Sequence, residues 1–266
     1  MSVSPSASPQ RPRRRPSREL PLSRWLDVLA FLAWGVLILR YWLTGKLDLL
    51  IHPNYRWLAI STGIVLVGIG VFRALQLRQQ SNQTGVPALS HISLFPRGVS
   101  SALLLLTAIF GMVIEPQAFT SQTALQRGVS DYIPLSRSQP QAFHGASRPE
   151  ERSLVEWIRT LNVYPEPDEY AGQKVNVIGF VIPASKSNLP EEYLTIARFV
   201  ITCCAADAYP VGLPVKLPDS NKNYPADEWF QVEGTMIVET FNNRRQLTIE
   251  AKSLKSIEAP DSPYEF

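Results

Sequence analysis

The sequence predicts a membrane α + β chain in which three N-terminal transmembrane helices are followed by a soluble, OB-like small β-barrel domain with one short amphipathic helix. Three apolar runs lie within the first 115 of 266 residues. Arginines are concentrated before the first run, and five short segments of β-strand character follow residue 172. Charged residues make up 18% of the chain, below the roughly 25% of an ordinary soluble protein. These observations together predict the two-part architecture.

Residues 1–24 form a basic arm rich in proline, serine and arginine, which has no apolar period and is expected to be disordered. The first apolar run covers residues 25–43. Its charged residues, Asp27 and Arg40, lie near the two ends, where they can reach the membrane surface. The run is longer than the apolar region of a signal peptide, and no small-residue cleavage site is evident. It is therefore interpreted as a retained span.

Two further spans are predicted at residues 57–75 and 99–115. The sixteen apolar residues that open the second run are close to the lower limit of about 17 for a span. Its glycines favour close helix contact, and packing within the same chain is the simpler interpretation. The third run ends at Glu115, which is followed by a proline.

The connection between the first two spans, residues 44–56, keeps four leucine and isoleucine residues, so we expect it to lie along the membrane surface. Its histidine, His52, is either a polar residue at this boundary or a metal ligand. The boundary interpretation is favoured, because a metal site needs further ligands.

The distribution of basic residues predicts the orientation. Three spans place the arm and the second loop on one side, and both are basic, whereas Lys46 and Arg56 of the first loop are offset by Asp48. Lysine and arginine stay on the cytoplasmic side of a span, so the N-terminus is predicted to be cytoplasmic and the C-terminal domain extracytoplasmic, in an inner, multi-pass location. The arginines concerned are Arg11, Arg13, Arg14, Arg15, Arg18 and Arg24 in and beside the arm, and Arg73, Arg78 and Arg97 in the second loop. Nucleic-acid binding is the other explanation of an arginine-rich arm, but the topology explains it more simply.

A polar linker, residues 116–151, precedes the soluble domain of residues 152–266. The domain begins with a predicted amphipathic helix, for which Ser153 is a suitable N-cap. Five strands within about ninety residues favour a small closed barrel, for which the five-stranded OB type is the obvious candidate. The predicted strands are 174–182, 193–202, 212–217, 229–240 and 246–257, with a hairpin loop at 241–245 between the last two.

The adjacent cysteines Cys203 and Cys204 are the densest chemical signal in the sequence. Three interpretations remain open: the end of a strand whose cysteines alternate between core and surface, a redox pair or strained disulfide, or a metal site. Two thiolates and Asp207 supply three ligands of the kind that zinc or Cu(I) takes. No glycine-rich phosphate loop, zinc-protease motif or nucleophile elbow is present in the sequence, so no catalytic residue is predicted and the chain is not expected to be an enzyme.

Two segments, TGKLDLLIHPNYRWL at 44–58 and ARFVITCCAADAYPVGL at 197–213, resemble the signature stretches of the bacterial DUF1980 (UPF0703) membrane family. The resemblance covers nearly the whole chain from the first span onward. It implies a subunit that works beside a larger multi-span permease of the UPF0718/DUF318 type, in the lipid bilayer and without nucleic acid. Arg198, Tyr209 and Pro210, which flank the cysteine pair, are candidates for a partner or solute surface.

The function expected from these observations is that of an accessory membrane subunit of a two-component permease, which presents its extracytoplasmic barrel to a multi-span partner or to the solute. The alternative is a membrane-anchored thiol redox or metal-binding protein that uses Cys203 and Cys204. A purely structural assembly factor is a third interpretation. No cofactor is predicted, apart from the metal ion that the alternative requires.

Overall fold

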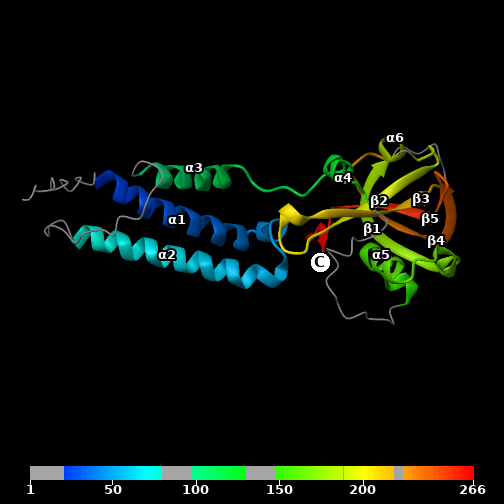
Figure 1. Cartoon of the computed structure of the whole chain (residues 1–266), viewed down its shortest axis with the longest axis horizontal. Coiled ribbons are helices and arrows are strands. Elements are labelled where there is room, and N and C mark those ends of the chain that lie inside the picture. Colours follow the sequence, from blue (N-terminus) through cyan, green and yellow to red (C-terminus); the bar gives the residue numbers. More distant parts are fainter. Residues whose placement is uncertain (1–20, 80–97, 130–147, 188, 219–223) are drawn as a thin grey trace, which may run out of the picture. The chain divides into compact units, whose positions relative to one another are not determined.

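The computed structural model describes residues 21–79, 98–129, 148–187, 189–218 and 224–266 (Figure 1). The arm of residues 1–20, most of the second loop and much of the linker lie outside the described residues. Contacts divide the chain into two compact units. One consists of Met1–Leu39 and Thr62–Ile114, and the other of Arg40–Ser61 and Glu115–Phe266. The connection between the first two helices thus belongs to the barrel unit, whereas the sequence analysis assigned it to the membrane domain.

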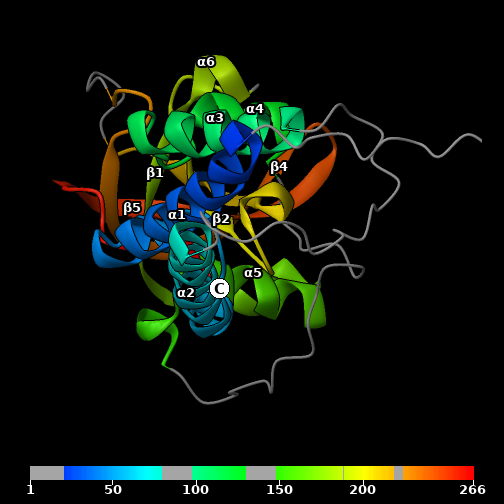
Figure 2. The same cartoon turned by 90° about the vertical axis from the view of Figure 1, so that its left-hand side faces the viewer.

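The helical unit contains most of α1 (Pro21–Leu43) and α2 (Arg56–Gln79), and all of α3 (Val99–Val113). Helix α1 lies between the other two helices (Figures 1 and 2). A methyl group on Gly35 of α1 would lie 2.7 Å from the side chain of Val67. The two helices therefore approach closely through small residues, and the predicted packing within the chain is confirmed.

Helix α3 packs on α1 through polar as well as apolar contacts. The indole of Trp34 donates a hydrogen bond to the carbonyl oxygen of Leu104 at 2.9 Å, and the hydroxyl of Ser101 donates to Asp27. Ala108 is fully buried. These contacts give Asp27 a partner on α3.

Two helical segments, Ser23–Leu43 and Pro53–Gln79, are long and apolar enough to cross a membrane. The third apolar run does form a helix, but α3 has only 15 residues. At 1.5 Å per residue it rises roughly 22 Å, less than the ~30 Å of a hydrocarbon core. The fold therefore shows two apolar helices of membrane-crossing length and a shorter third one.

The barrel unit contains a closed five-stranded β-barrel, as the sequence predicted. Its strands pair in the order β1-β4-β5-β3-β2, and β2 pairs with β1 to close the barrel. The pairing of β3 with β5 is parallel and the other four pairings are antiparallel. The strands are β1 (Lys174–Pro183), β2 (Tyr193–Val200), β3 (Tyr209–Lys216), β4 (Trp229–Phe241) and β5 (Arg244–Ile257), and the short β6 (Tyr264–Glu265) runs parallel to β2.

The β4–β5 hairpin is tighter than the predicted five-residue loop. Asn242 and Asn243 alone connect the strands, with φ of 50° and 62°. A two-residue turn with both φ values positive matches the right-handed twist of the flanking strands, and asparagine tolerates this conformation. Lys252 is the extra residue of a β-bulge in β5, opposite Glu233 and Gly234, and a methyl group on Gly234 would collide with the carbonyl oxygen of Glu250.

Helix α5 (Leu154–Val163) packs against the barrel core. Ser153 is its N-cap, as predicted. The Ser153 hydroxyl accepts from the backbone of Glu156, and the Glu156 carboxylate accepts from the backbone of Ser153. This reciprocal pair satisfies two backbone donors at the start of the helix. The apolar face of the helix is fully buried in the core, which includes Leu154, Trp157, Ile158, Ile196, Leu213, Met236 and Ile249.

Candidate functional site

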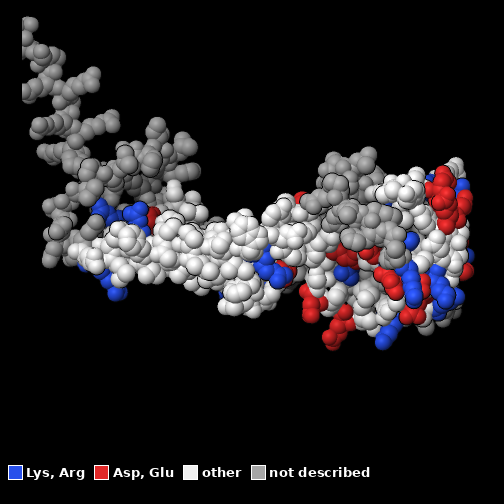
Figure 3. Space-filling view, turned by 90° about the horizontal axis from the view of Figure 1, so that it is seen from below, with Lys and Arg blue, Asp and Glu red and all other residues white. Residues whose placement is uncertain are grey.

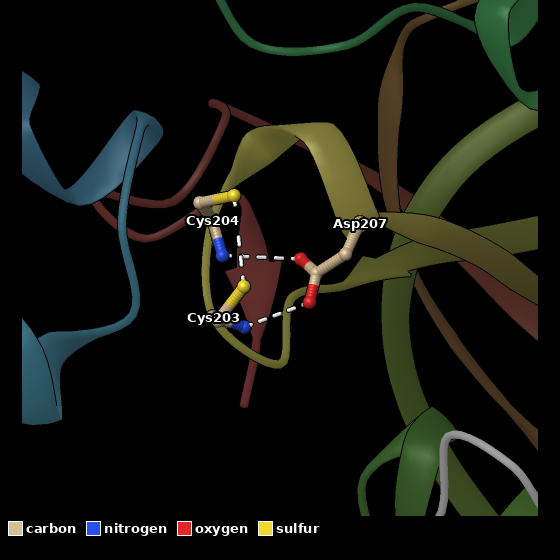
Figure 4. A group of neighbouring side chains, drawn as sticks. All are labelled: Cys203, Cys204 and Asp207. Atoms are coloured by element: carbon tan, nitrogen blue, oxygen red, sulfur yellow. Dashed lines mark hydrogen bonds between the residues drawn. The ribbon is translucent and has the colours of Figure 1, made fainter.

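The cysteine pair lies in the turn between β2 and β3, and Asp207 organises this turn (Figure 4). One carboxylate oxygen of Asp207 accepts a hydrogen bond from the backbone N–H of Cys203 at 2.9 Å, and the other accepts from Cys204 at 3.1 Å. The hydroxyl of Thr202 also donates to Asp207. The chain therefore folds around one carboxylate, which satisfies backbone donors that no strand pairs.

The two sulfur atoms lie on the same side of the turn, 3.6 Å apart (Figure 4). Both cysteines are free thiols; Cys203 is exposed and Cys204 is half-buried. Strand β2 ends at Val200, before the cysteines, so they do not alternate between core and surface as adjacent residues in a strand do. Both sulfurs and a carboxylate oxygen of Asp207 lie within 4.8 Å of one another. The structure thus brings all three predicted metal-site residues together.

The carboxylate and the thiols influence each other's protonation. The side-chain hydrogen bond to Asp207, followed by that to Cys204, raises the pKa of Cys203 from 9.0 to about 11. Partial burial alone would raise the pKa of Asp207, but hydrogen bonds from Thr202 and the two cysteines outweigh it and hold that pKa below its usual value. At neutral pH the site therefore consists of a protonated Cys203 thiol beside an ionised carboxylate.

The segment of residues 44–58 lies beside this turn and pairs with it. Ile51 and Cys204 form an antiparallel β-bridge. The N–H of His52 donates to the carbonyl oxygen of Cys203 at 3.0 Å, and the N–H of Ala205 donates to the carbonyl oxygen of Leu50 at 2.8 Å. The two stretches on which the family resemblance was based are therefore in direct contact.

Internal contacts keep the 44–58 segment in shape. The guanidinium of Arg56 donates to both carboxylate oxygens of Asp48, at 3.0 and 2.7 Å, and Lys46 pairs with Glu115. Gly45 has a φ of 71°, a conformation that disfavours other residues. A bidentate arginine pair fixes orientation as well as distance. The segment is thus an ordered loop in which residues 50–52 lie against the cysteine turn.

His52 belongs to the site, although it was interpreted as a boundary residue. Its Nδ1 accepts a hydrogen bond from the N–H of Asn54 at 3.1 Å, so in the neutral ring the proton is on Nε2. The ring packs edge-on against Phe266, with centroids 4.9 Å apart. Burial lowers the pKa of His52, while the charge of Asp207 acts in the opposite direction. His52 therefore contacts the cysteine turn through its backbone N–H, and its ring is not part of the group of metal-ligating side chains.

Arg127 supports the opposite side of the turn, and the sequence analysis missed it. It ends the short helix α4 (Ser121–Arg127) and donates to the carbonyl oxygens of Ala205, at 3.4 Å, and Ala208. Its guanidinium lies 4.7 Å from the ring centroid of Phe119. No local pattern in the polar linker signalled this role.

The structure places Arg198, Tyr209 and Pro210 inside the barrel wall, not on a surface that a partner or solute touches. Arg198 is 8% exposed and Tyr209 6% exposed, and Pro210 is buried. The guanidinium of Arg198 pairs with Glu265 at 3.5 Å, donates to the carbonyl oxygen of Ser262 and lies over the ring of Trp229. The predicted surface is corrected accordingly: these residues are buried in the barrel wall.

Residues 150–266 match the family model of the DUF1980 C-terminal domain. The match includes the barrel, α5 and the cysteine turn, and it does not include the 44–58 segment. No curated protein matches the chain. The part of the chain that carries the barrel, residues 150–266, is therefore similar to the C-terminal domain of the DUF1980 family.

Proposed function

We propose that the chain is a membrane-anchored accessory subunit of a two-component permease, and that it presents an extracytoplasmic, OB-like barrel to a multi-span partner or to the partner's solute. One observation carries the membrane topology on which this proposal depends. The 44–58 segment, which connects α1 to α2, is bonded to the cysteine turn of the barrel.

The bridge between Ile51 and Cys204 restricts the ways in which the chain can cross a membrane. If α1 and α2 both cross, the segment between them and the barrel lie on the same side. The chain then leaves α2 on the opposite side and has to cross once more before it reaches the barrel. Helix α3 is the apolar helix described between α2 and the barrel, which supports three spans. Its short length is compatible with this role where the bilayer thins locally.

The exposure of the helices also supports a lipid environment. Only 28% of the most apolar window of Ser23–Leu43 is buried, and 11% of that of Pro53–Gln79. Large apolar side chains such as Phe72, at 60% exposed, and Val113, at 75%, are not covered by the part of the chain that the structure describes. On the face shown in Figure 3, the helices carry few charged side chains along most of their length. Lipid or a partner helix has to cover such a surface, because water does so at a high cost in free energy.

An accessory role is favoured over transport by this chain alone. Charged residues in the described helices lie toward the helix ends, as Asp27, Arg40 and Arg73 do, whereas ionisable residues inside a membrane usually mark a transport pathway. The assignment of the partner to the UPF0718/DUF318 type rests on the family resemblance. The basic residues of the arm and second loop support a cytoplasmic N-terminus.

Cysteine labelling in sealed cells tests the topology. In a Cys203→Ser, Cys204→Ser background, Ser253→Cys adds a thiol at an exposed position of β5, and Ser81→Cys adds one in the second loop. A membrane-impermeant maleimide should label the first variant in intact cells and the second only after permeabilisation. Labelling of both or neither in intact cells, or the reverse pattern, contradicts the topology.

Affinity purification from solubilised membranes tests the partnership. Mass spectrometry should find a multi-span membrane protein at a ratio comparable to that of the tagged chain. The matched control is a tagged variant that lacks residues 150–266, which keeps the helices and loses the barrel. A partner recovered equally well by this control does not need the barrel, and recovery of no multi-span protein with the full chain contradicts the proposal.

The geometry also favours one half of the alternative function. Reactive redox cysteines have a lowered pKa, whereas that of Cys203 is raised to about 11. Cys203 is therefore poorly suited to act as a nucleophile at neutral pH. Metal binding, in which the ion itself displaces the thiol protons, remains the better second candidate.

A further inference from the structure

We infer that Cys203, Cys204 and Asp207 form an open, exchangeable binding site for a tetrahedral divalent cation of the zinc type. This inference is independent of the permease partnership, because it rests on the geometry of the cysteine turn alone. Among the residues that the structure describes, these three form a group of metal-ligating side chains with their donor atoms within 4.8 Å of one another.

The separation of the sulfurs matches tetrahedral coordination. With zinc–sulfur bonds of about 2.3 Å and a tetrahedral angle, two thiolates on one ion lie roughly 3.8 Å apart. In this structure Sγ of Cys203 and Sγ of Cys204 are 3.6 Å apart. A linear two-coordinate ion would need about 4.6 Å at the same bond length, and a disulfide only ~2.05 Å. The pair is therefore set for a tetrahedral chelate.

The backbone around the thiols is held in place before any ion binds. The carboxylate of Asp207 accepts from the N–H groups of both cysteines. On the other side, residues 50–52 bond to Cys203 and Ala205 through their own backbone groups. Neither set of bonds uses the sulfur atoms. The site therefore loses little conformational entropy when it takes up a ligand, which is what favours binding by preorganised groups.

Asp207 can serve as the third ligand without releasing the turn. One of its oxygens accepts from the Thr202 hydroxyl and the N–H of Cys203, whereas the other accepts from the N–H of Cys204. The thiol of Cys203 also donates to this carboxylate, and that bond ends when the ion replaces the thiol proton. A carboxylate oxygen has two lone pairs, so the second oxygen keeps one for a cation. Binding is ligand exchange without redox change: the dication replaces the two thiol protons, which are released to the solvent.

Three protein ligands leave the fourth tetrahedral position open to water or to an incoming donor. Closed four-ligand zinc sites are structural, whereas sites with an open position exchange ligands. Cys203 is exposed, so an incoming donor can reach the ion. His52 does not belong to the group of side chains whose donor atoms lie within 4.8 Å of one another, and its Nδ1 already accepts from Asn54, so the fourth position stays open. The geometry therefore assigns the site to metal capture and transfer.

Cobalt(II) provides the direct test, since it gives intense thiolate-to-metal charge-transfer absorption and strong visible bands when tetrahedral. The reduced full chain in detergent should show both kinds of band, which saturate at one equivalent and are displaced by zinc. Cys203→Ser and Cys204→Ser should each weaken binding more than about a hundredfold, because loss of an outer contact alone costs tenfold to a hundredfold. Asp207→Asn should weaken it about tenfold or more, and Ser253→Ala, at an exposed position of β5, should leave the affinity and the stoichiometry unchanged.

A measurement on the unmutated chain guards against variants that fail to fold. Saturating zinc should slow alkylation of both thiols, and a soluble chelator should restore the rate within the mixing time, as expected of an open site. The inference is overturned if wild-type protein gives no saturable cobalt–thiolate band, or if the band survives in both serine variants. Slow removal by the chelator overturns the exchangeable character of the site, and binding of trivalent arsenic without cobalt or zinc overturns the choice of cation.

Discussion

Ile51 and Cys204 face each other across a β-bridge, although one precedes α2 and the other follows β2. The bridge joins the loop between the first two helices to the turn that carries both thiols. Because the contact uses backbone groups, it does not depend on the side chain at position 51 or 52. Its strength can therefore be tested by removing a single N–H donor.

His52→Pro should loosen the cysteine turn. His52 has φ of −62°, which proline adopts without strain, so the substitution removes the N–H that donates to Cys203 and little else from the backbone. The loss of about 1 kcal/mol should raise the alkylation rate of the half-buried Cys204 roughly fivefold. His52→Ala is the matched control, since it removes the same ring and keeps the N–H. Equal rates in the two variants would show that this hydrogen bond does not hold the turn.

Asp207→Asn should make Cys203 more reactive. The hydrogen bond to the carboxylate is the main cause of the raised pKa of about 11, compared with the ordinary 9.0. A full return to the ordinary value would increase the thiolate fraction at neutral pH about a hundredfold, and the loss of Asp207 should account for the larger part of that increase, which alkylation follows. The rate should be measured against pH in a Cys204→Ala background, with Asp227→Asn as a control at a different turn. An unchanged profile would contradict the role given to Asp207.

Acid should release the turn before it unfolds the barrel. The pKa of folded Asp207 is lower than the ordinary 3.8, so the carboxylate contributes stability above that value. The contribution is lost as the pH falls through the lower pKa of the folded chain. Cys203 and Cys204 are the two cysteines of the chain, so ¹⁵N-cysteine labelling gives two backbone amide signals. Both should shift together, with one midpoint below 3.8. A midpoint above the ordinary value would contradict the hydrogen-bonding account.

Gly234→Ala should destabilise the barrel. A methyl group at the bulge collides with the carbonyl oxygen of Glu250, and both atoms belong to paired backbone that cannot move freely. We expect a loss of about 1–3 kcal/mol, the usual range for overpacking. Gly68→Ala is the control, since no atom lies within 4 Å of the added methyl group and alanine favours a helix. Thermal unfolding of the two variants in the same detergent should give a lower midpoint for the first alone.

The sequence predicted the parts of the fold that follow from local periodicity. Alternating β-branched residues located the five strands, and Ser153 with its capping partner Glu156 located α5. The predicted end of a strand was wrong where a side chain, rather than a neighbouring strand, hydrogen-bonds to the backbone. The strand predicted to reach Thr202 ends at Val200. Beyond it the N–H of Ile201 donates to Glu265, and the carboxylate of Asp207 accepts from the N–H groups of Cys203 and Cys204, which draws the chain into a turn.

The sequence analysis identified the three residues that make up the candidate site, but it missed the residues that surround them. Cys203, Cys204 and Asp207 are close in sequence, so their proximity could be inferred. His52 and Arg127 reach the site only through the tertiary fold. Leu47 and Ile51 were interpreted as residues that lie along a membrane surface. The contact of this segment with the cysteine turn could not be predicted, because a single β-bridge leaves no periodic pattern in the sequence. Arg198 looked like a surface residue because its partners, Trp229, Ser262 and Glu265, are remote in sequence.

The backbone enters the barrel unit twice, first through residues 40–61 and again from residue 115 onward. A soluble fragment cut at the start of the family match would leave Cys203 and Ala205 without the partners that residues 50–52 supply. A crystal structure of such a fragment would therefore show the two cysteines without the backbone contacts that they have in the full chain. A soluble fragment that keeps the native cysteine turn therefore needs residues 44–58 joined to the barrel through a designed linker.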